Sequence, residues 1–262
     1  MTDWLDLHLG NMAFTMPNIN SYTVDELYAA VGQPAVIPVA DWRDEPSLVN
    51  HRPKFLVDTP PVANMWSLCT SSLPGPSVRL IDFTESFHIP FNPDFDGPGT
   101  PLGLAAPELI LGFLSEITTS VDIWAFACTC WELLGRHFLF NAPFNTRAEL
   151  LADVIFLLRG KERENISERF WNLFWGKLGG ERWFDQNGQP VSGNEEYWIG
   201  GTKGWKDWEE RIKHLRGSGE DPLSREDEEV LKKVLKAALR FEPIERATAK
   251  EIVQMVPEMW EK

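Results

Sequence analysis

The chain has 262 residues, 43% of them hydrophobic, which is enough apolar material for a substantial core and excludes global disorder. Its formal net charge of -14 at pH 7 argues against general affinity for nucleic acid or an anionic membrane surface, and it leaves room for a basic partner. The three cysteines form no C-x-x-C pair, and no apolar run reaches the length of a membrane span. We therefore expect an intracellular protein, cytoplasmic or nuclear, that binds neither nucleic acid nor membrane; its oligomeric state is left open.

The first pattern in the chain is DLHLGNMAF at residues 6–14, where an acid, Asp6, is followed five residues later by an amide, Asn11, and then by a short strand candidate. Taken alone, D-x-x-x-x-N is also typical of an ordinary loop that leads into a strand. Residues 15–77 are rich in Pro, Asn and Ser and contain one helical patch, Thr23 to Val31, with Thr23 as its cap. We interpret this part as a long surface excursion.

Strand character returns in SVRLIDF at residues 77–83, which carries Asp82 to the end of the strand. A carboxylate at that position can be a metal ligand or a turn residue. Residues 84–104 then contain many Pro and Gly without periodicity, and the loop closes on Ala106-Pro107-Glu108. Long loops without regular structure inside compact domains are usually functional.

The rest of the chain is organised around residues 119–135, TSVDIWAFACTCWELLG, whose apolar side chains cover every face of a helix. Such a pattern predicts a helix that is buried on all sides. Thr119 is placed to cap its N-terminus, with Asp122 three residues further on, and Gly135 is placed to be the left-handed residue that ends it.

Three more helices are predicted towards the C-terminus, at residues 145–159, 224–240 and 248–260. Between the first two of them, residues 161–221 mix charges, Trp and Gly, and include three acids, Asp207, Glu209 and Glu210.

The order of these motifs resembles the C-terminal lobe of eukaryotic protein kinases: D-x-x-x-x-N, a strand that ends in Asp-Phe, an irregular loop that closes on Ala-Pro-Glu, and a buried helix that opens with Asp-x-Trp. The likeness is greatest to the SR-protein-kinase-like (SRPK-like) serine/threonine kinases abundant in fungi. It rests on DLH-x-GN-x-AFT-x-P at residues 6–17, E-L-Y-x-x-x-G-x-P at 26–34 and F-E-P-x-x-R-A-T-A at 241–249.

The resemblance covers nearly the whole chain and implies a mainly α fold, a partial kinase domain over residues 1–262. This fold is a C-terminal lobe with a short β-hairpin at the catalytic loop and with helices packed around the buried helix at 119–135. Residues 15–77 are then an insert between the catalytic loop and the metal-binding Asp, and 161–221 an insert with a docking-like region.

The resemblance also assigns roles to residues of the site. It implies that Asp6 is the catalytic base that orients a substrate hydroxyl. Asn11 and Asp82 would hold the Mg²⁺ ions that bridge the phosphates of ATP, and His8 stands where most kinases have a phosphate-contacting Lys.

Further positions would hold the lobe together or contact the substrate. The resemblance implies that Glu108 pairs with Arg246 and that Asp122 accepts hydrogen bonds from the catalytic-loop backbone, which competes with its role near the helix cap. The implied partner is a protein substrate, possibly basic and Arg-Ser-rich. The acids at 207, 209 and 210 are then either docking contacts or a solvated helix face.

The sequence also departs from the family. Trp4 stands where the catalytic loop usually has His, Leu5 replaces the usual polar residue before Asp6, Thr84 replaces the Gly after Asp-Phe, and Ala105 stands where many relatives have Arg.

The printed chain starts five residues before Asp6 and contains no Gly-rich phosphate loop and no strand Lys for the phosphates. We therefore expect these residues alone to be catalytically incompetent, because positioning and electrostatics supply nearly all of this catalysis. The alternative is a pseudokinase or truncated kinase that acts as a protein-interaction module; a longer natural chain with an upper lobe is compatible with either.

Overall fold

The computed structural model describes residues 2–3, 6–39, 53–59, 61–70, 75–88, 99–140, 146–159, 163–191, 208–216 and 223–257. Of the described residues, 56% are helical and 7% lie in strands, so the fold is mainly helical, as the sequence predicts. It divides into two compact units, a larger one of residues 1–11 and 82–262 and a smaller one of residues 12–81. No helix in the described ranges is long and apolar enough to cross a membrane.

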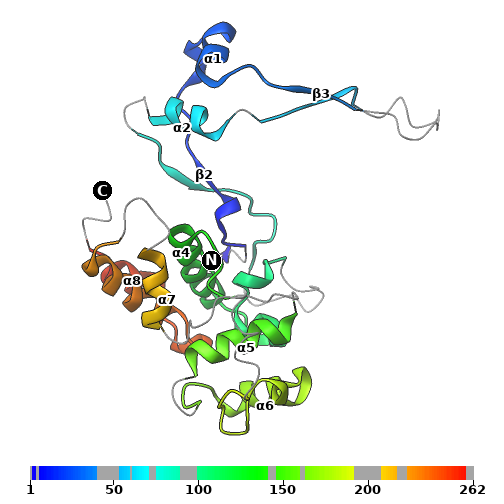
Figure 1. The fold of residues 1–262 in the computed structure, drawn as a ribbon, viewed down its shortest axis with the longest axis vertical. Helices are drawn as coiled ribbons and strands as arrows, with labels where there is room; N and C mark the ends of the chain where they lie inside the picture. The colour runs from blue at the N-terminus through cyan, green and yellow to red at the C-terminus, as the bar shows by residue number, and fades with distance from the viewer. Residues whose placement is uncertain are drawn as a thin grey trace, which may run out of the picture. The chain divides into compact units, whose positions relative to one another are not determined.

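The larger unit contains the principal helices. They are α3 (Pro107–Leu111), α4 (Ser120–Gly135), α5 (Arg147–Leu158), α6 (Glu168–Leu178), α7 (Trp208–Arg216), α8 (Arg225–Ala238) and α9 (Ala249–Met255). Of these helices, Figure 1 labels α4, α5, α6, α7 and α8. Short 3-10 turns lie between them: η1 (Leu9–Asn11), η4 (Leu102–Leu104), η5 (Leu114–Glu116), η6 (Gly180–Arg182) and η7 (Pro243–Glu245).

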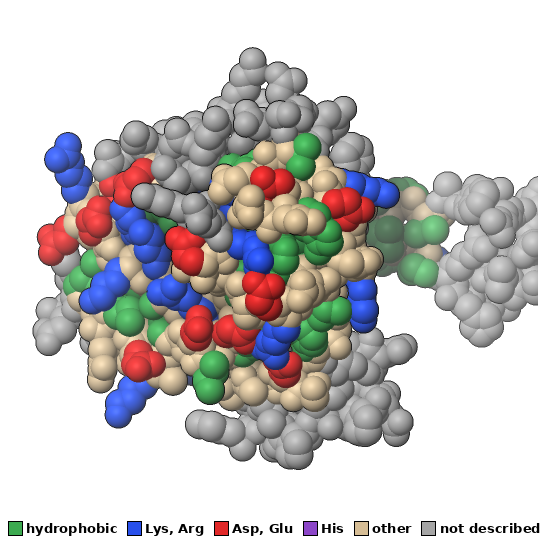
Figure 2. Space-filling model, turned by 90° about the horizontal axis from the view of Figure 1, so that it is seen from below, with side chains coloured by type: hydrophobic (Ala, Val, Ile, Leu, Met, Phe, Trp, Pro, Cys, Tyr) green, Lys and Arg blue, Asp and Glu red, His purple; other side chains and the backbone are tan. Residues whose placement is uncertain are grey.

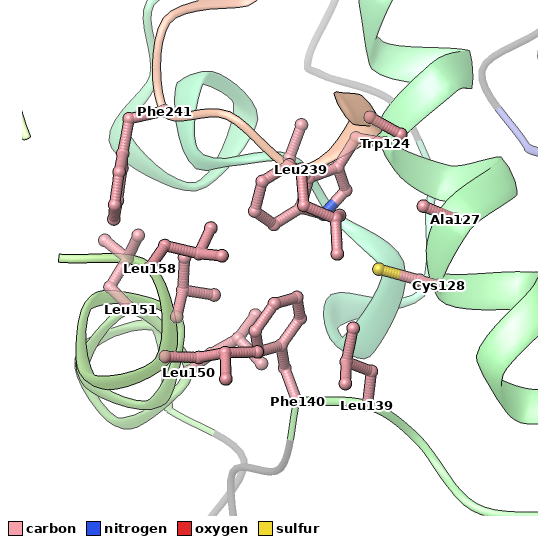
Figure 3. Packing of buried hydrophobic residues seen from close by; sticks show 14 of the residues in the cluster. Trp124, Ala127, Cys128, Leu139, Phe140, Leu150, Leu151, Leu158, Leu239 and Phe241 are labelled. Atoms are coloured by element: carbon pink, nitrogen blue, oxygen red, sulfur yellow. The ribbon is translucent and has the colours of Figure 1, made fainter. Parts of the chain in front are cut away.

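The core of the larger unit forms around α4, the helix that the sequence places at its centre. α4 packs against α7 and α8 and also contacts η1 and η4. Trp124 is fully buried and stacks on Phe140, with ring centroids 5.5 Å apart. Figure 3 shows these side chains with Cys128 of α4 facing leucines of α5. The expected burial of every face is wrong for the last turns, where Leu133 is 64% exposed.

Both predicted ends of α4 are corrected by the structure. Thr119 makes no capping hydrogen bond, and the Thr118 hydroxyl instead accepts one from the Ser120 amide at 3.3 Å. Gly135 lies inside the helix, and Arg136, with φ of 58°, is the left-handed residue that ends it. Gly135 allows close packing, because a Cβ there would lie 2.8 Å from a methyl group of Leu215 in α7 and would force that side chain to move.

The other helices follow their local signals more closely. Thr146, Ser224 and Thr248 each accept a hydrogen bond from a backbone amide at the start of their helix, as N-caps do. The predicted helix at 248–260 ends earlier, at Met255, because the residue before Pro257 takes an extended conformation, with φ of -85° and ψ of 132° at Val256. Residues 258–260 lie outside the described part of the chain.

Short antiparallel strand pairs flank the Asp6 to Asn11 loop on both sides. Before the loop, β1 (Thr2–Asp3) pairs with β6 (Phe87–His88) in the larger unit. After it, β2 (Met12–Phe14) pairs with β5 (Val78–Leu80) in the smaller unit. The strand predicted over residues 77–83 is therefore shorter than expected.

The smaller unit contains more regular structure than the predicted surface excursion with one helix. Its second hairpin joins β3 (Val36–Pro38) to β4 (Phe55–Val57). The capped helix α1 (Val24–Val31) is present as predicted and contacts a second helix, α2 (Val62–Thr70). Trp66 of α2 meets Phe14 edge to face, with centroids 5.0 Å apart.

Candidate functional site

The Asp6 to Asn11 loop is closed by its own side chains. Asn11 is buried, and its Nδ2 donates to the backbone oxygen of Asp6 at 3.0 Å and to Asp6 Oδ2 at 2.9 Å. The Asn11 amide donates to the His8 carbonyl at 3.0 Å within η1. These bonds fix the Asp6 carboxylate relative to the backbone and turn Asn11 Oδ1 away from it, so the loop presents two oxygen-bearing side chains in a set geometry.

Helix α4 anchors the same loop through Thr129. Its hydroxyl donates to the Leu7 carbonyl at 3.0 Å, and both residues are buried. Sequence reasoning missed Thr129 because a Thr inside an apolar helix carries no local signal of a partner so distant in the chain. It pointed instead to Asp122, which lies in the first turn of α4. The loop residues at positions 4 and 5 lie outside the described ranges, so that role of Asp122 stays a prediction.

Asp82 adopts a backbone conformation that non-glycine residues rarely occupy, with φ of 61°. Asp82 lies two residues after Leu80, which pairs with Met12. Asn11 directly precedes Met12, so Asn11 and Asp82 adjoin the same end of this strand pair. Such conformations persist only where the surroundings hold them, and they cluster at functional sites.

The Asp82 carboxylate is exposed and engaged on one side by Thr84. The Thr84 hydroxyl donates to Asp82 Oδ1 at 2.7 Å, and its amide approaches the same oxygen at 3.4 Å. These bonds lower the pKa of Asp82 from its ordinary value, and the charge of His8 lowers it further.

His8 also contacts Asp6 directly, with Nε2 3.4 Å from Asp6 Oδ2. On the other side of the ring, the Gly10 amide donates to His8 Nδ1 at 3.0 Å. The structure thus brings together Asp6, His8 and Asn11.

A buried ion pair holds the helices behind the site. Glu108 in α3 and Arg246 after η7 both have fully buried side chains, and they form the predicted pair through two parallel hydrogen bonds of 2.7 and 2.6 Å. This bidentate geometry joins residues 138 positions apart in the chain. It fixes the end of the 84–104 loop to the C-terminal helices.

Two of the predicted side chains could ligate a metal ion. Within the described residues, no three His, Cys, Asp or Glu side chains gather as a metal site. Asn11 Oδ1 and the Asp82 carboxylate are hard oxygen donors, and Mg²⁺ is commonly held by one or two such protein ligands together with substrate phosphates. Each of the two side chains is thus a ligand of the type that Mg²⁺ takes.

No protein-family model matches this chain, and no curated protein matches it. The site is therefore defined by its geometry alone.

The acidic docking candidates are described only in part. Glu209 in α7 is exposed and pairs with Lys232 of α8, so it belongs to a solvated helix face. Asp207 and the side chain of Glu210 lie outside what the structure describes. The face seen in Figure 2 carries acidic and basic side chains side by side, without a large area of one sign.

Proposed function

We propose that these 262 residues form the lower, magnesium- and acceptor-binding lobe of a serine/threonine protein-kinase-like domain. One observation carries the proposal: both strands that flank the Asp6 to Asn11 loop pair with the two strands that flank Asp82. Two short antiparallel strand pairs of this kind can hold the side chains of Asp6, Asn11 and Asp82 beside each other on loops. Catalytic groups usually lie on such loops.

In this proposal each side chain has one task. Asp6 accepts a hydrogen bond from the Ser or Thr hydroxyl of a protein substrate and orients it. Asn11 and Asp82 hold Mg²⁺ through Asn11 Oδ1 and the Asp82 carboxylate. When bound with ATP, the metal supplies the positive charge that offsets the negative charge of the transferring phosphoryl group.

The surrounding contacts support such a role because this chemistry depends mainly on positioning. The Thr129 hydroxyl ties the loop backbone to the most buried helix, and the pair of Glu108 with Arg246 ties the adjoining segment to the C-terminal helices. A loop whose backbone is anchored at Leu7 by a buried hydrogen bond can keep the Asp6 carboxylate in a fixed place.

These residues alone are proposed not to transfer phosphate. The printed sequence contains neither a G-x-G-x-x-G stretch nor a V-A-x-K strand, so the residues that would cover and pair the nucleotide phosphates are not among them. The lobe would hold the metal and the acceptor, and a nucleotide-gripping lobe would have to act with it.

A second function, a protein-interaction module of pseudokinase type, is favoured by the surface of the smaller unit. Both strands of its second hairpin are exposed: Val36 and Ile37 are 57% and 50% exposed, and Phe55, Leu56 and Val57 are 52%, 55% and 57% exposed. Contiguous apolar surface of this kind marks interaction sites in soluble proteins. The two functions differ in whether the metal site is used.

Manganese, a paramagnetic substitute for Mg²⁺, tests the metal site directly. In the presence of ADP, Mn²⁺ should broaden the NMR signals of Asn11 and Asp82 at lower concentration than those of Glu229, an exposed acid on α8. Asp82→Asn should remove this preference while tolerating the left-handed backbone, because Asn adopts it as readily as Asp. Glu229→Gln, which removes the same charge elsewhere, should leave it unchanged. Equal broadening in wild type and Asp82→Asn would show that the metal assignment is wrong.

Competence needs a separate measurement. Radiolabel from Mg-ATP should not reach an Arg-Ser peptide when the 262-residue chain is the only protein present. Incorporation that disappears in Asp6→Asn would overturn the proposed incompetence and keep the kinase-like assignment.

A further inference from the structure

The His8 imidazole is held from both sides. The Gly10 amide donates to Nδ1 at 3.0 Å, so Nδ1 contributes a lone pair and the neutral ring carries its proton on Nε2. That nitrogen lies 3.4 Å from Asp6 Oδ2. The ring therefore has Nδ1 against the Gly10 amide and Nε2 at ion-pair distance from the carboxylate.

Gly10 makes room for the ring. A Cβ at position 10 would lie 2.8 Å from His8 Cε1 and 2.9 Å from Nδ1, closer than side chains approach each other. The backbone at this position needs no left-handed conformation, so the requirement for Gly comes from the imidazole. His8 and Gly10 act as a pair, in which the absent side chain of one admits the ring of the other.

The two oxygens of Asp6 have different surroundings. Oδ2 receives the Asn11 amide at 2.9 Å and faces His8 Nε2. Oδ1 is buried and has no hydrogen-bond donor in the described part of the chain. The polar contacts of the carboxylate therefore gather on Oδ2 and set its rotation.

We propose that His8 is a positioning residue for Asp6: with Asn11 it contacts Oδ2 and fixes the rotation of the carboxylate that orients the substrate hydroxyl. This inference rests on the proposed function. It assigns to His8 a contact with the acidic side chain, in addition to any contact with phosphate. The ring bridges a backbone amide and a carboxylate, and a flexible Lys could not make both contacts because it has no acceptor.

Two substitutions separate the two contacts of His8. In His8→Asn the short side chain can still accept from the Gly10 amide, because an Asn side chain commonly accepts from the backbone amide two residues further on. Its side-chain NH₂ group, however, cannot reach Asp6. In His8→Gln the longer side chain can approach Asp6. The measurements are the exchange rates of the Gly10 amide and of the Asn11 side-chain NH₂, together with the carboxyl ¹³C shift of Asp6.

The expected result is specific to a positioning role. His8→Asn should leave Gly10 exchange nearly unchanged and shift the Asp6 carboxyl signal. It should also accelerate exchange of the Asn11 NH₂ by about three- to tenfold, the factor expected when a hydrogen bond of ordinary net strength, here that from Asn11 to Asp6, is weakened. His8→Gln should restore the wild-type Asn11 and Asp6 signals, and Gly10→Ala should disturb all three. If the Asn11 and Asp6 signals are unchanged in His8→Asn, the inference is overturned. If His8→Asn does not fold, Gly10→Ala takes its place, and unchanged signals in that variant overturn the inference.

These measurements need no nucleotide or metal. If the exchange and ¹³C measurements contradict the role of His8, the manganese test of the proposed function still stands. If the manganese test fails, the exchange and ¹³C measurements still decide whether His8 positions Asp6.

Discussion

Removing the charge of Glu108 is the sharpest test of how the larger unit is held together. Its partner Arg246 donates to both carboxylate oxygens and also to the backbone oxygens of Ser120 and Arg240, at 3.0 and 2.9 Å. The guanidinium lies 5.1 Å from the ring centroid of Trp124, and neither side chain of the pair is exposed. Glu108→Gln keeps the shape of the side chain but leaves a cation in the core without its counter-charge.

The size of the effect follows from that burial. Removing one partner of a buried ion pair costs about 3–5 kcal/mol, because the remaining charge is desolvated and uncompensated. Arg246 keeps several carbonyl acceptors, so the lower end, about 3 kcal/mol, is expected for Glu108→Gln. With a urea dependence of about 2.5 kcal/mol per M, the unfolding midpoint should fall by roughly 1.2 M.

The assay is urea unfolding followed by Trp fluorescence and by far-ultraviolet circular dichroism, and the matched control is Glu116→Gln. Glu116 pairs with Arg169, whose side chain is 42% exposed, so this substitution should cost less than about 1 kcal/mol. The double variant Glu108→Leu with Arg246→Met should not regain full stability, because the carbonyls that Arg246 satisfies would lose their donor. A loss for Glu108→Gln no larger than that of the control would refute the reasoning.

Three further outcomes are expected. Gly135→Ala forces a Cβ against α7 and should lower stability by about 1–3 kcal/mol, whereas Gly176→Ala, in open space on α6, should raise it by up to about 1 kcal/mol; thermal unfolding compares the two. Thr129→Val removes a buried donor and should speed amide exchange in the Asp6 to Asn11 loop, while the melting temperature changes little. Burial raises the pKa of Glu242, but hydrogen bonds from Arg169 bring it below its ordinary value of 4.5. This pair therefore adds stability above about pH 4.5 that is lost as the pH falls through the lowered pKa. Glu242→Gln should flatten that dependence by at most about 1 kcal/mol, and unfolding midpoints measured from pH 6 to pH 3 check it.

Much of the candidate site could be predicted because its residues are marked by short motifs. Asp6 and Asn11 stand five residues apart, and the structure joins them by a hydrogen bond of the kind that spacing permits. The pairing of Glu108 with Arg246 was also predictable, although only through the resemblance, since no local pattern links positions so far apart. The left-handed backbone of Asp82 was not predicted, because it depends on the strand pair that precedes it and on the turn that follows.

The sequence by itself determined the mainly helical character of the chain and several helix starts, because a cap such as Thr23 or Ser224 forms its hydrogen bond within one turn. Only the tertiary structure decided the purpose of Gly135, which admits a leucine from α7, and the partner of Thr129, which lies 122 residues away. Hydrogen bonds within a turn depend on neighbouring residues and can be read from them. Contacts between distant segments depend on how whole helices pack, and the same Gly or Thr fits several arrangements until that packing is known.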